Sequence, residues 1–250
     1  MTPGELQHFQ PARDELRERV ILVTGAGDGI GRAVALALAK HGATVVLSGR
    51  TVRKLEATHD AILAADGPRP SIAPLNLETA LASDYDALAA AIDKSYGRLD
   101  GLLHNAALLG QLSPIEHYDV PTWVRVLHVN VTATFALTQV CLPLLRRSAD
   151  ASVLFTSSSV GRRGRALWGA YAVSKFAIEG LTQVLADETS SGIIRVNCIN
   201  PVRARTAMRS QAYPAEDPAT LPNPAALVGA YLYLLGPASR GVSGQSLDCL

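Results

Sequence analysis

What the sequence lacks narrows the classes of protein it could belong to. Its longest apolar runs fall well short of the roughly 20 residues that span a bilayer, and residues 1–19 have no apolar core typical of a secretory signal. Basic and acidic residues nearly cancel, with a formal net charge of +1, and no basic tract or acidic tail indicates a nucleic-acid partner. We therefore expect a soluble, cytoplasmic protein that binds neither nucleic acid nor membrane.

Cysteine is also scarce. Cys141, Cys198 and Cys249 form no C-x-x-C pair and have no zinc-like spacing. Because Cys141 and Cys198 sit within apolar runs, they are expected to be reduced core residues. The sequence therefore predicts no metal site.

The chain does have the length and apolar content for one large core. Its 250 residues are 48% hydrophobic and 18% charged, which suits a single α/β domain. Residues 1–18 form a polar lead-in, in which Pro3, Gly4 and Pro11 oppose a long helix, and we expect it to lie on the surface. Residues 19–250 are expected to form the domain.

Apolar strand-like runs alternate with helical stretches along this domain. Residues 20–24 (VILVT) are a continuous apolar run, typical of a parallel strand buried on both faces. Similar runs recur at 151–157 and 194–199, and the longest helical stretches are 121–147 and 170–190. This alternation predicts a Rossmann-type, doubly wound sheet of about seven parallel strands with helices on both faces.

A glycine-rich turn follows the first strand, with Thr24, Gly25, Gly29 and Gly31 in the pattern T-G-x-x-x-G-x-G. Glycine permits a tight turn and close approach of a phosphate, whose charge the following helix N-terminus attracts. The strand–turn–helix–strand context favours a dinucleotide site. The alternative is a turn that only packs helix against sheet.

The end of the second strand bears on which dinucleotide is bound. NAD binders carry an acidic residue there, whereas this sequence has Gly49 followed by Arg50, with Arg53 and Lys54 close behind. Arg50 could bind a 2′-phosphate as a bidentate donor. This sequence therefore favours NADP(H) over NAD(H). The alternative is that Arg50 is only a solvated residue of a loop, in which case the cofactor could be NAD(H).

Tyr171 and Lys175 are four residues apart in a helical stretch, so they share one face. A cation beside a tyrosine lowers its pKa from about 10, which would let the phenol exchange a proton with an alcohol or carbonyl oxygen. Ser158 could hydrogen-bond the same oxygen. The alternative is a half-buried tyrosine beside a solvated lysine.

These motifs, in this order and with Asn130 ahead of them, resemble the short-chain dehydrogenase/reductase family from about Arg19 to Asp248. Within the family the chain looks most like the bacterial YciK-type oxidoreductases, through FTSSSVGR, WGAYAVSKFA and NCINP. The resemblance implies hydride transfer between a nicotinamide and a carbonyl or secondary alcohol. Tyr171 would be the general acid/base, Lys175 would lower its pKa and hold the nicotinamide ribose, Ser158 would polarise the substrate oxygen, and Asn130 would position a water.

The resemblance also implies the cofactor contacts. Asn76 stands where the family usually has Asp, beside the adenine, and residues 104–107 (HNAA) resemble the family's N-N-A-G. The full expected set is Thr24, Gly25, Asp28, Gly29, Ile30, Gly31, Arg50, Asn76, Leu77, Asn105, Ala106, Ala107, Tyr171, Lys175, Pro201 and Thr206.

Three departures from the family pattern concern the site. His104 and Ala107 replace Asn and Gly, and Val202 replaces the Gly after Pro201. Because a β-branched residue adopts positive φ with difficulty, we expect the loop at Val202 to run differently. A proline-rich lid over the substrate is expected at about 203–224.

The resemblance implies a homodimer or homotetramer, since relatives pair through the helices matching 121–147 and 170–190. Both stretches are apolar around much of their circumference.

The rival hypothesis is a redox-sensing or scaffold protein that binds NADP(H) with little turnover. Arginines near the expected site mouth indicate either an anionic substrate or a solvated surface; they are Arg162, Arg163, Arg165, Arg203, Arg205 and Arg209.

Overall fold

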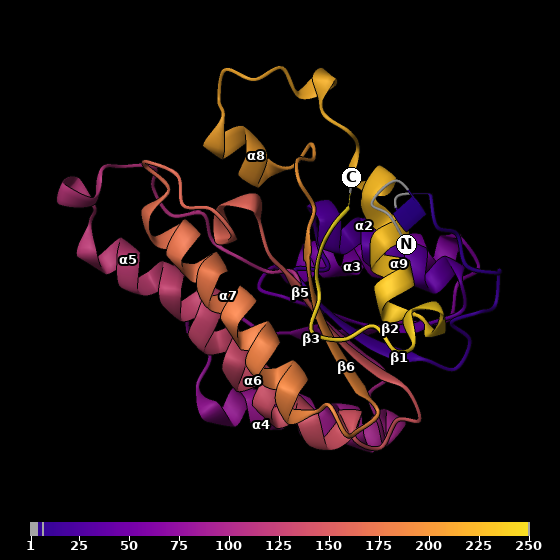
Figure 1. The fold of residues 1–250 in the computed structure, drawn as a ribbon. Coiled ribbons are helices and arrows are strands. Elements are labelled where there is room, and N and C mark those ends of the chain that lie inside the picture. The colour runs from indigo at the N-terminus through magenta and orange to yellow at the C-terminus, as the bar shows by residue number, and fades with distance from the viewer. Residues whose placement is uncertain (1–4, 7, 250) are drawn as a thin grey trace.

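The computed structural model describes residues 5, 6 and 8–249. Its centre is a sheet of seven strands in the order β3-β2-β1-β4-β5-β6-β7, with every neighbouring pair parallel (Figure 1). The predicted doubly wound sheet is therefore confirmed. The strands are β1 (Val20–Thr24), β2 (Thr44–Gly49), β3 (Ser71–Pro74), β4 (Gly101–His104), β5 (Ala151–Thr156), β6 (Ile194–Asn200) and β7 (Ser246–Asp248).

Helices cover both faces of this sheet (Figure 1). One face carries α2 (Gly29–Lys40), α3 (Val52–Ala64) and α9 (Val228–Leu235), and the other carries α4 (Ala82–Tyr96), α5 (Val120–Leu127), α6 (Ala133–Leu145) and α7 (Gly169–Glu188). Each layer has its own buried apolar cluster against the sheet.

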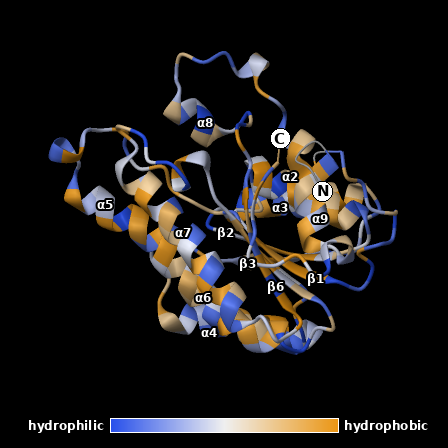
Figure 2. Ribbon diagram, in the orientation of Figure 1, coloured by the Kyte–Doolittle hydropathy of each residue, from blue (hydrophilic) through white to orange (hydrophobic). Residues whose placement is uncertain are grey.

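The number of apolar residues in each strand depends on how fully the two helical layers cover that strand. The strands β1, β4, β5 and β6 are buried along their whole length, whereas the edge strands β3 and β7 are partly exposed. Figure 2 shows the central strands as hydrophobic. A parallel strand covered on both faces needs apolar side chains on both, which is why the sequence shows continuous apolar runs rather than alternation.

The expected helix at 121–147 consists of three pieces. It runs as α5, then a π-helical turn at His128–Thr132, then α6. Length and composition alone would let Val120–Leu145 cross a membrane. However, α6 buries Leu137, Cys141 and Leu144 against the sheet, so this is a core helix of the domain.

The N-terminal lead-in differs from the expectation that it lies on the surface. Leu6 and Leu16 are fully buried in the cluster beneath α2 and α9, and the Phe9 ring packs edge-on against Tyr233 at 5.4 Å. The lead-in therefore completes the α2–α9 layer. Pro3 and Gly4 lie outside the described residues.

The sheet topology places the site. The chain leaves β1 toward β2 and β3 on one side, and later returns to add β4 on the other side of β1. Ligands of doubly wound sheets bind at the carboxyl ends of the strands at such a switch. The segment expected as a lid begins here and contains α8 (Ala207–Ala212), which stands above this edge (Figure 1).

Candidate active site

The glycine turn joins β1 to α2 with almost no free space. Gly25 and Gly29 have φ of +69° and +52°, a region that favours glycine. A Cβ on Gly31 would lie 2.3 Å from the Gly25 carbonyl oxygen and 2.6 Å from the Asn105 amide. No other side chain fits at Gly31, so the start of α2 approaches β1 and β4 as closely as backbones allow.

Thr24 and Asp28 hold the two ends of this turn. The Thr24 hydroxyl accepts hydrogen bonds from the N–H groups of Asn105 (2.9 Å) and Ala106 (3.1 Å), which ties β1 to the segment after β4. The Asp28 side chain caps α2 by accepting from the Gly29 N–H at 2.8 Å. The first turn of α2 contains no acidic residue, so its N-terminus presents a positive dipole end to the cavity.

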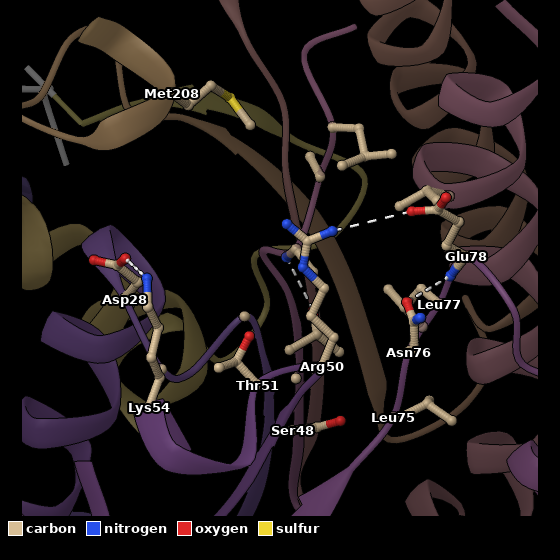
Figure 3. Close-up of a pocket in the computed structure, with 18 of the residues that line it drawn as sticks. Asp28, Ser48, Arg50, Thr51, Lys54, Leu75, Asn76, Leu77, Glu78 and Met208 are labelled. Atoms are coloured by element: carbon tan, nitrogen blue, oxygen red, sulfur yellow. Dashed lines mark hydrogen bonds and ion pairs between the residues drawn. The ribbon is translucent and has the colours of Figure 1, made fainter. Parts of the chain in front are cut away.

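A cavity of about 400 Å³ runs from this turn along the strand ends to α8 (Figure 3). It brings together many of the expected cofactor residues: Thr24, Gly25, Asp28, Arg50, Asn76, Leu77, Ala106 and Ala107. The other expected residues do not line it. Among them, Gly31 and Asn105 pack beneath the turn, and Thr206 lies beside Gly29.

The charged end of the cavity lies beyond β2. Arg50 extends into it with 61% of its side chain exposed (Figure 3). Lys54 turns instead to Asp28, with Nζ 2.5 Å from Oδ2, and this contact lowers the pKa of the Asp28 carboxyl. Of these two cations, Lys54 is held in a close ion pair, whereas the nearest carboxylate oxygen to Arg50 lies 4.0 Å away.

The expected catalytic residues come from three elements. Ser158 follows β5, Tyr171 and Lys175 lie on α7, and Asn130 lies in the π-turn. Ser158 hydrogen-bonds the Tyr171 phenol. Lys175 donates from Nζ to the Thr156 carbonyl at 2.7 Å and lies 5.5 Å from the centre of the Tyr171 ring.

Asn130 acts as a clamp between two elements. Its Oδ1 accepts from the Leu108 N–H at 2.7 Å, and its Nδ2 donates to the Leu108 carbonyl and to the Ser174 hydroxyl, both at 2.9 Å. These bonds use both protons of the side-chain amide, so a water would have to find another partner here. Asn130 lies in a π-turn, a rare element whose backbone bonds join residues i and i+5 and which is frequent at functional sites.

The electrostatics of the pair differ from the expectation that Lys175 lowers the pKa of Tyr171. Tyr171 is only 8% exposed, and burial raises its pKa to about 12, with the Ser158 hydrogen bond acting in the opposite direction. Burial also lowers the pKa of Lys175 to about 8, opposed by Cys198 and Glu179. A phenol that stays protonated at neutral pH is suited to donate a proton to a carbonyl oxygen.

Glu179, which the sequence analysis did not single out, lies one turn after Lys175. Its buried carboxylate accepts from the Ser157 hydroxyl at 2.5 Å and from the Cys198 thiol at 2.9 Å, and Arg162 Nε lies 3.5 Å away. Arg162 also pairs with Asp248 of β7 at 2.8 Å. The i, i+4 spacing from Lys175 is the sequence signal that could have found this residue.

An apolar and aromatic cover separates Tyr171 from solvent. The Trp168 ring lies 5.7 Å from Tyr171 and 5.9 Å from Tyr213, and Ala212 of α8 joins the same cluster. Arg209 stacks at 3.8 Å on the Tyr213 ring and pairs with Glu216 through two bonds of 2.6 and 2.7 Å. Two of the arginines expected at the mouth, Arg162 and Arg209, are therefore already neutralised.

The loop at Val202 keeps the conformation that a glycine would adopt. Val202 has φ of +61°, and its N–H donates to Oδ1 of Asn200 at 3.0 Å. For a β-branched residue this left-handed backbone costs about 1–2 kcal/mol. Valine therefore does adopt the positive φ that is difficult for a β-branched residue, and the hydrogen bond to Asn200 helps to hold it there.

His104 occupies the position of the family's first Asn and lies in the core. Its ring stacks on Phe155 at 5.0 Å and Nε2 hydrogen-bonds the Thr138 hydroxyl at 2.9 Å. Nδ1 has no hydrogen-bond partner among the described residues. Burial lowers the pKa of His104 to about 3, so the ring is neutral in the folded protein at physiological pH.

The fold and this arrangement of residues define an oxidoreductase of the short chain dehydrogenase family, to which the chain belongs through a match over residues 19–217. Proteins of this family act on CH–OH and C=O groups with nicotinamide cofactors. The predicted family is therefore confirmed.

Two relatives show how far the similarity extends. The chain is 51% identical over 241 residues to the uncharacterized oxidoreductase YciK of Escherichia coli K12, covering 96% of this chain and 95% of that protein. It also matches a structure from Shigella flexneri 2a strain 301 complexed with NADP, with TM-score 0.93 and 50% identity over 95% of this chain and 99% of that one. The similarity to YciK-type oxidoreductases, expected from the sequence, is thus confirmed.

The buried imidazole of His104 predicts a pH dependence of stability. The folded-state pKa lies below the ordinary value of 6.5, so the unfolded chain binds the proton more tightly and stability falls as pH drops below 6.5. Between pH 7 and pH 5 this ring should lower the free energy of unfolding by about 2 kcal/mol. Urea unfolding of the wild type and His104→Asn at both pH values measures the difference.

The control is His117→Asn, which removes an exposed histidine. It should retain the wild-type loss of stability between the two pH values, whereas His104→Asn should lose about 2 kcal/mol less. Equal losses in all three proteins would contradict a neutral buried ring.

Proposed function

We propose that this chain is an NADP(H)-dependent oxidoreductase that interconverts a carbonyl compound and a secondary alcohol, with Tyr171 as the general acid/base. The observation that carries the proposal is a buried Tyr171 whose ring centre lies 5.5 Å from Nζ of Lys175, on the same edge of the sheet as the cavity. When bound, the nicotinamide supplies or accepts the hydride.

The residues of the cavity suit a phosphorylated dinucleotide. Gly25 lines the cavity without a side chain to block it, the N-terminus of α2 favours negative charge, and Arg50 offers a planar donor for a phosphate. Asn76 and Leu77 line the far end, where the family resemblance implies the adenine.

In the reductive direction, Tyr171 donates its phenolic proton to the carbonyl oxygen while Ser158 hydrogen-bonds the same oxygen. Because burial raises the pKa of Tyr171, the phenolate that forms when it donates its proton needs a neighbouring cation to stabilise it. Lys175, held by the Thr156 carbonyl, is that cation. Asn130 and Ser174 keep α7 and the Leu108 segment aligned.

Replacing Tyr171 by Phe tests the acid/base role. We expect Tyr171→Phe to lower turnover of NADPH with reactive ketones and aldehydes by at least about 100-fold, because general acid–base groups contribute roughly 10²–10⁴-fold. NADPH binding, followed by nicotinamide fluorescence, should stay within about twofold of wild type, because the phenol contributes little to binding energy. The control is Tyr85→Phe, which removes a buried hydroxyl from the α4 side of the sheet.

Retained turnover in Tyr171→Phe would contradict the assignment. A wild-type protein that binds NADPH tightly but reduces none of a broad panel of ketones and aldehydes would favour the rival hypothesis of a redox-sensing or scaffold protein.

The preference for NADP(H) is tested at Arg50. Its support is the absence of an acidic residue at Gly49, the exposed Arg50 guanidinium and the NADP complex of the Shigella flexneri relative. We expect Arg50→Asp to weaken NADPH binding at least about 30-fold while NADH binding changes less than about threefold, because only NADPH carries the phosphate that the guanidinium would bind. Fluorescence titrations of both nucleotides provide the measurement.

Arg69→Asp makes the same charge change on the loop before β3, away from the cavity. It should leave the ratio of the two affinities unchanged. An unchanged ratio in Arg50→Asp as well would mean that another residue selects the nucleotide.

We also propose that the chain forms a homodimer or homotetramer through α5, α6 and α7. These helices carry many hydrophobic residues (Figure 2). Several of their large apolar side chains are exposed, namely Val120, Val124, Phe135, Val173, Phe176 and Val184. Scattered apolar residues are normal on a surface, but a group of this size on adjacent helices marks an interaction site.

Sedimentation equilibrium should show a dimer or tetramer for wild type and a monomer for Phe176→Glu, because the new charge would be buried without a partner. The control Leu81→Glu places a charge on an exposed leucine at the start of α4 and should keep the assembly. A monomeric wild type would contradict the proposal.

A further inference from the structure

Glu78 is an acidic side chain at the very place where a negative charge would harm binding of a 2′-phosphate. It follows Asn76 and Leu77 after β3 and lines the same cavity as Arg50. Figure 3 shows Arg50 and Glu78 converging over the cavity. Their nearest charged atoms, Arg50 NH1 and Glu78 Oε2, lie 4.0 Å apart, too far for a hydrogen bond.

A second arginine binds the Glu78 carboxylate at a shorter distance than Arg50 does. Arg125 of α5 places Nε 2.7 Å from Oε1 and donates from NH2 to Oε2 at 2.9 Å. This is the two-pronged geometry in which arginine binds a carboxylate best. Both carboxylate oxygens are thus engaged by Arg125, and Arg50 remains the looser neighbour.

We propose that Arg125 is a remote specificity residue, which keeps Arg50 available for the 2′-phosphate of NADP(H) by neutralising Glu78. The proposal rests on the NADP(H) preference proposed above, and adds which residue protects it. Arg125 does not line the cavity; it acts through Glu78, so it is a positioning residue rather than a direct contact.

The role of Arg125 follows from the balance of charges among the lysine, arginine and carboxylate groups at this end of the cavity. Lys54 is paired with Asp28, so Arg50 is the principal cation left for a phosphate. Without Arg125, Glu78 would hold an uncompensated charge 4.0 Å from Arg50. It would draw the guanidinium into an ion pair and would repel the phosphate directly. Both effects weaken NADPH binding, and neither touches NADH, which has no 2′-phosphate.

A purely structural role predicts something different. The Arg125–Glu78 pair also joins α5 to the segment after β3, and an anchor of that kind would support the adenine end for both nucleotides alike. Its loss would then weaken NADPH and NADH equally. The ratio of the NADPH and NADH affinities, rather than either affinity alone, therefore distinguishes a specificity role of Arg125 from a structural one.

The experiment titrates wild type and variants with NADPH and with NADH, followed by nicotinamide fluorescence at low ionic strength. Arg125→Ala should weaken NADPH binding about five- to tenfold and change NADH binding less than about twofold. Arg125→Gln, which keeps the length of the side chain without its charge, should behave in the same way. Added salt should shrink the NADPH loss, because surface charges are screened.

The double variant Arg125→Ala/Glu78→Gln supplies the matched control. Removing the carboxylate charge should restore NADPH binding to within about twofold of wild type, since the charge that Arg125 neutralises is then gone. Glu78→Gln alone should bind NADPH at least as tightly as wild type. Such reversal in a double-mutant cycle measures the coupling of the two residues directly.

Equal weakening of both nucleotides in Arg125→Ala, or a double variant no better than Arg125→Ala, would overturn the proposal and leave a structural anchor. Arg50→Asp distinguishes this failure from failure of the NADP(H) preference itself. If Arg50→Asp abolishes selectivity while Arg125→Ala leaves it unchanged, only the role of Arg125 is lost. If Arg50→Asp leaves selectivity unchanged, both proposals fail.

Discussion

The geometry of the site depends on the space left by the missing side chain of Gly31. Because a Cβ there would collide with the Gly25 carbonyl and the Asn105 amide, α2 can begin directly against the switch between β1 and β4. The Thr24 hydroxyl holds the β4 side of that junction through two backbone N–H groups. The cavity, the exposed helix N-terminus and the path of residues 105–109 all follow from this contact. Close packing of backbone against backbone thus sets where a ligand can lie.

Two of the proposed catalytic side chains are held by hydrogen bonds to the backbone. Lys175 is bound to the Thr156 carbonyl and Asn130 to both polar groups of the Leu108 backbone. Glu179 adds a buried charge that fixes the serine next to Ser158. Groups locked in this way do not need to reorganise during a reaction, which is the main source of electrostatic stabilisation in enzymes. The strained backbone of Val202 is held by the same kind of local hydrogen bond.

Much of the fold and of the candidate site could be predicted from the sequence, and the features that were not predicted have physical explanations. The parallel strands and the glycine turn were readable because continuous apolar runs and left-handed turns restrict the residue types they accept. The burial of Leu6 and Leu16 was missed because the lead-in looks polar as a whole, although two apolar side chains are enough to seal a layer. The raised pKa of Tyr171 was missed because burial depends on distant segments such as α8 and Trp168. Likewise, only tertiary structure brings Arg125 to Glu78, which are 47 residues apart.

The burial of the lead-in also has a consequence for how the domain folds. Leu6 and Leu16 pack in the same cluster as Leu232 and Leu235 of α9, although these two segments lie far apart along the chain. Contacts between such distant segments raise the contact order, which slows folding. An intermediate in which the two segments have not yet met leaves the apolar face of the α2–α9 layer open, and exposed apolar surface of this kind favours aggregation.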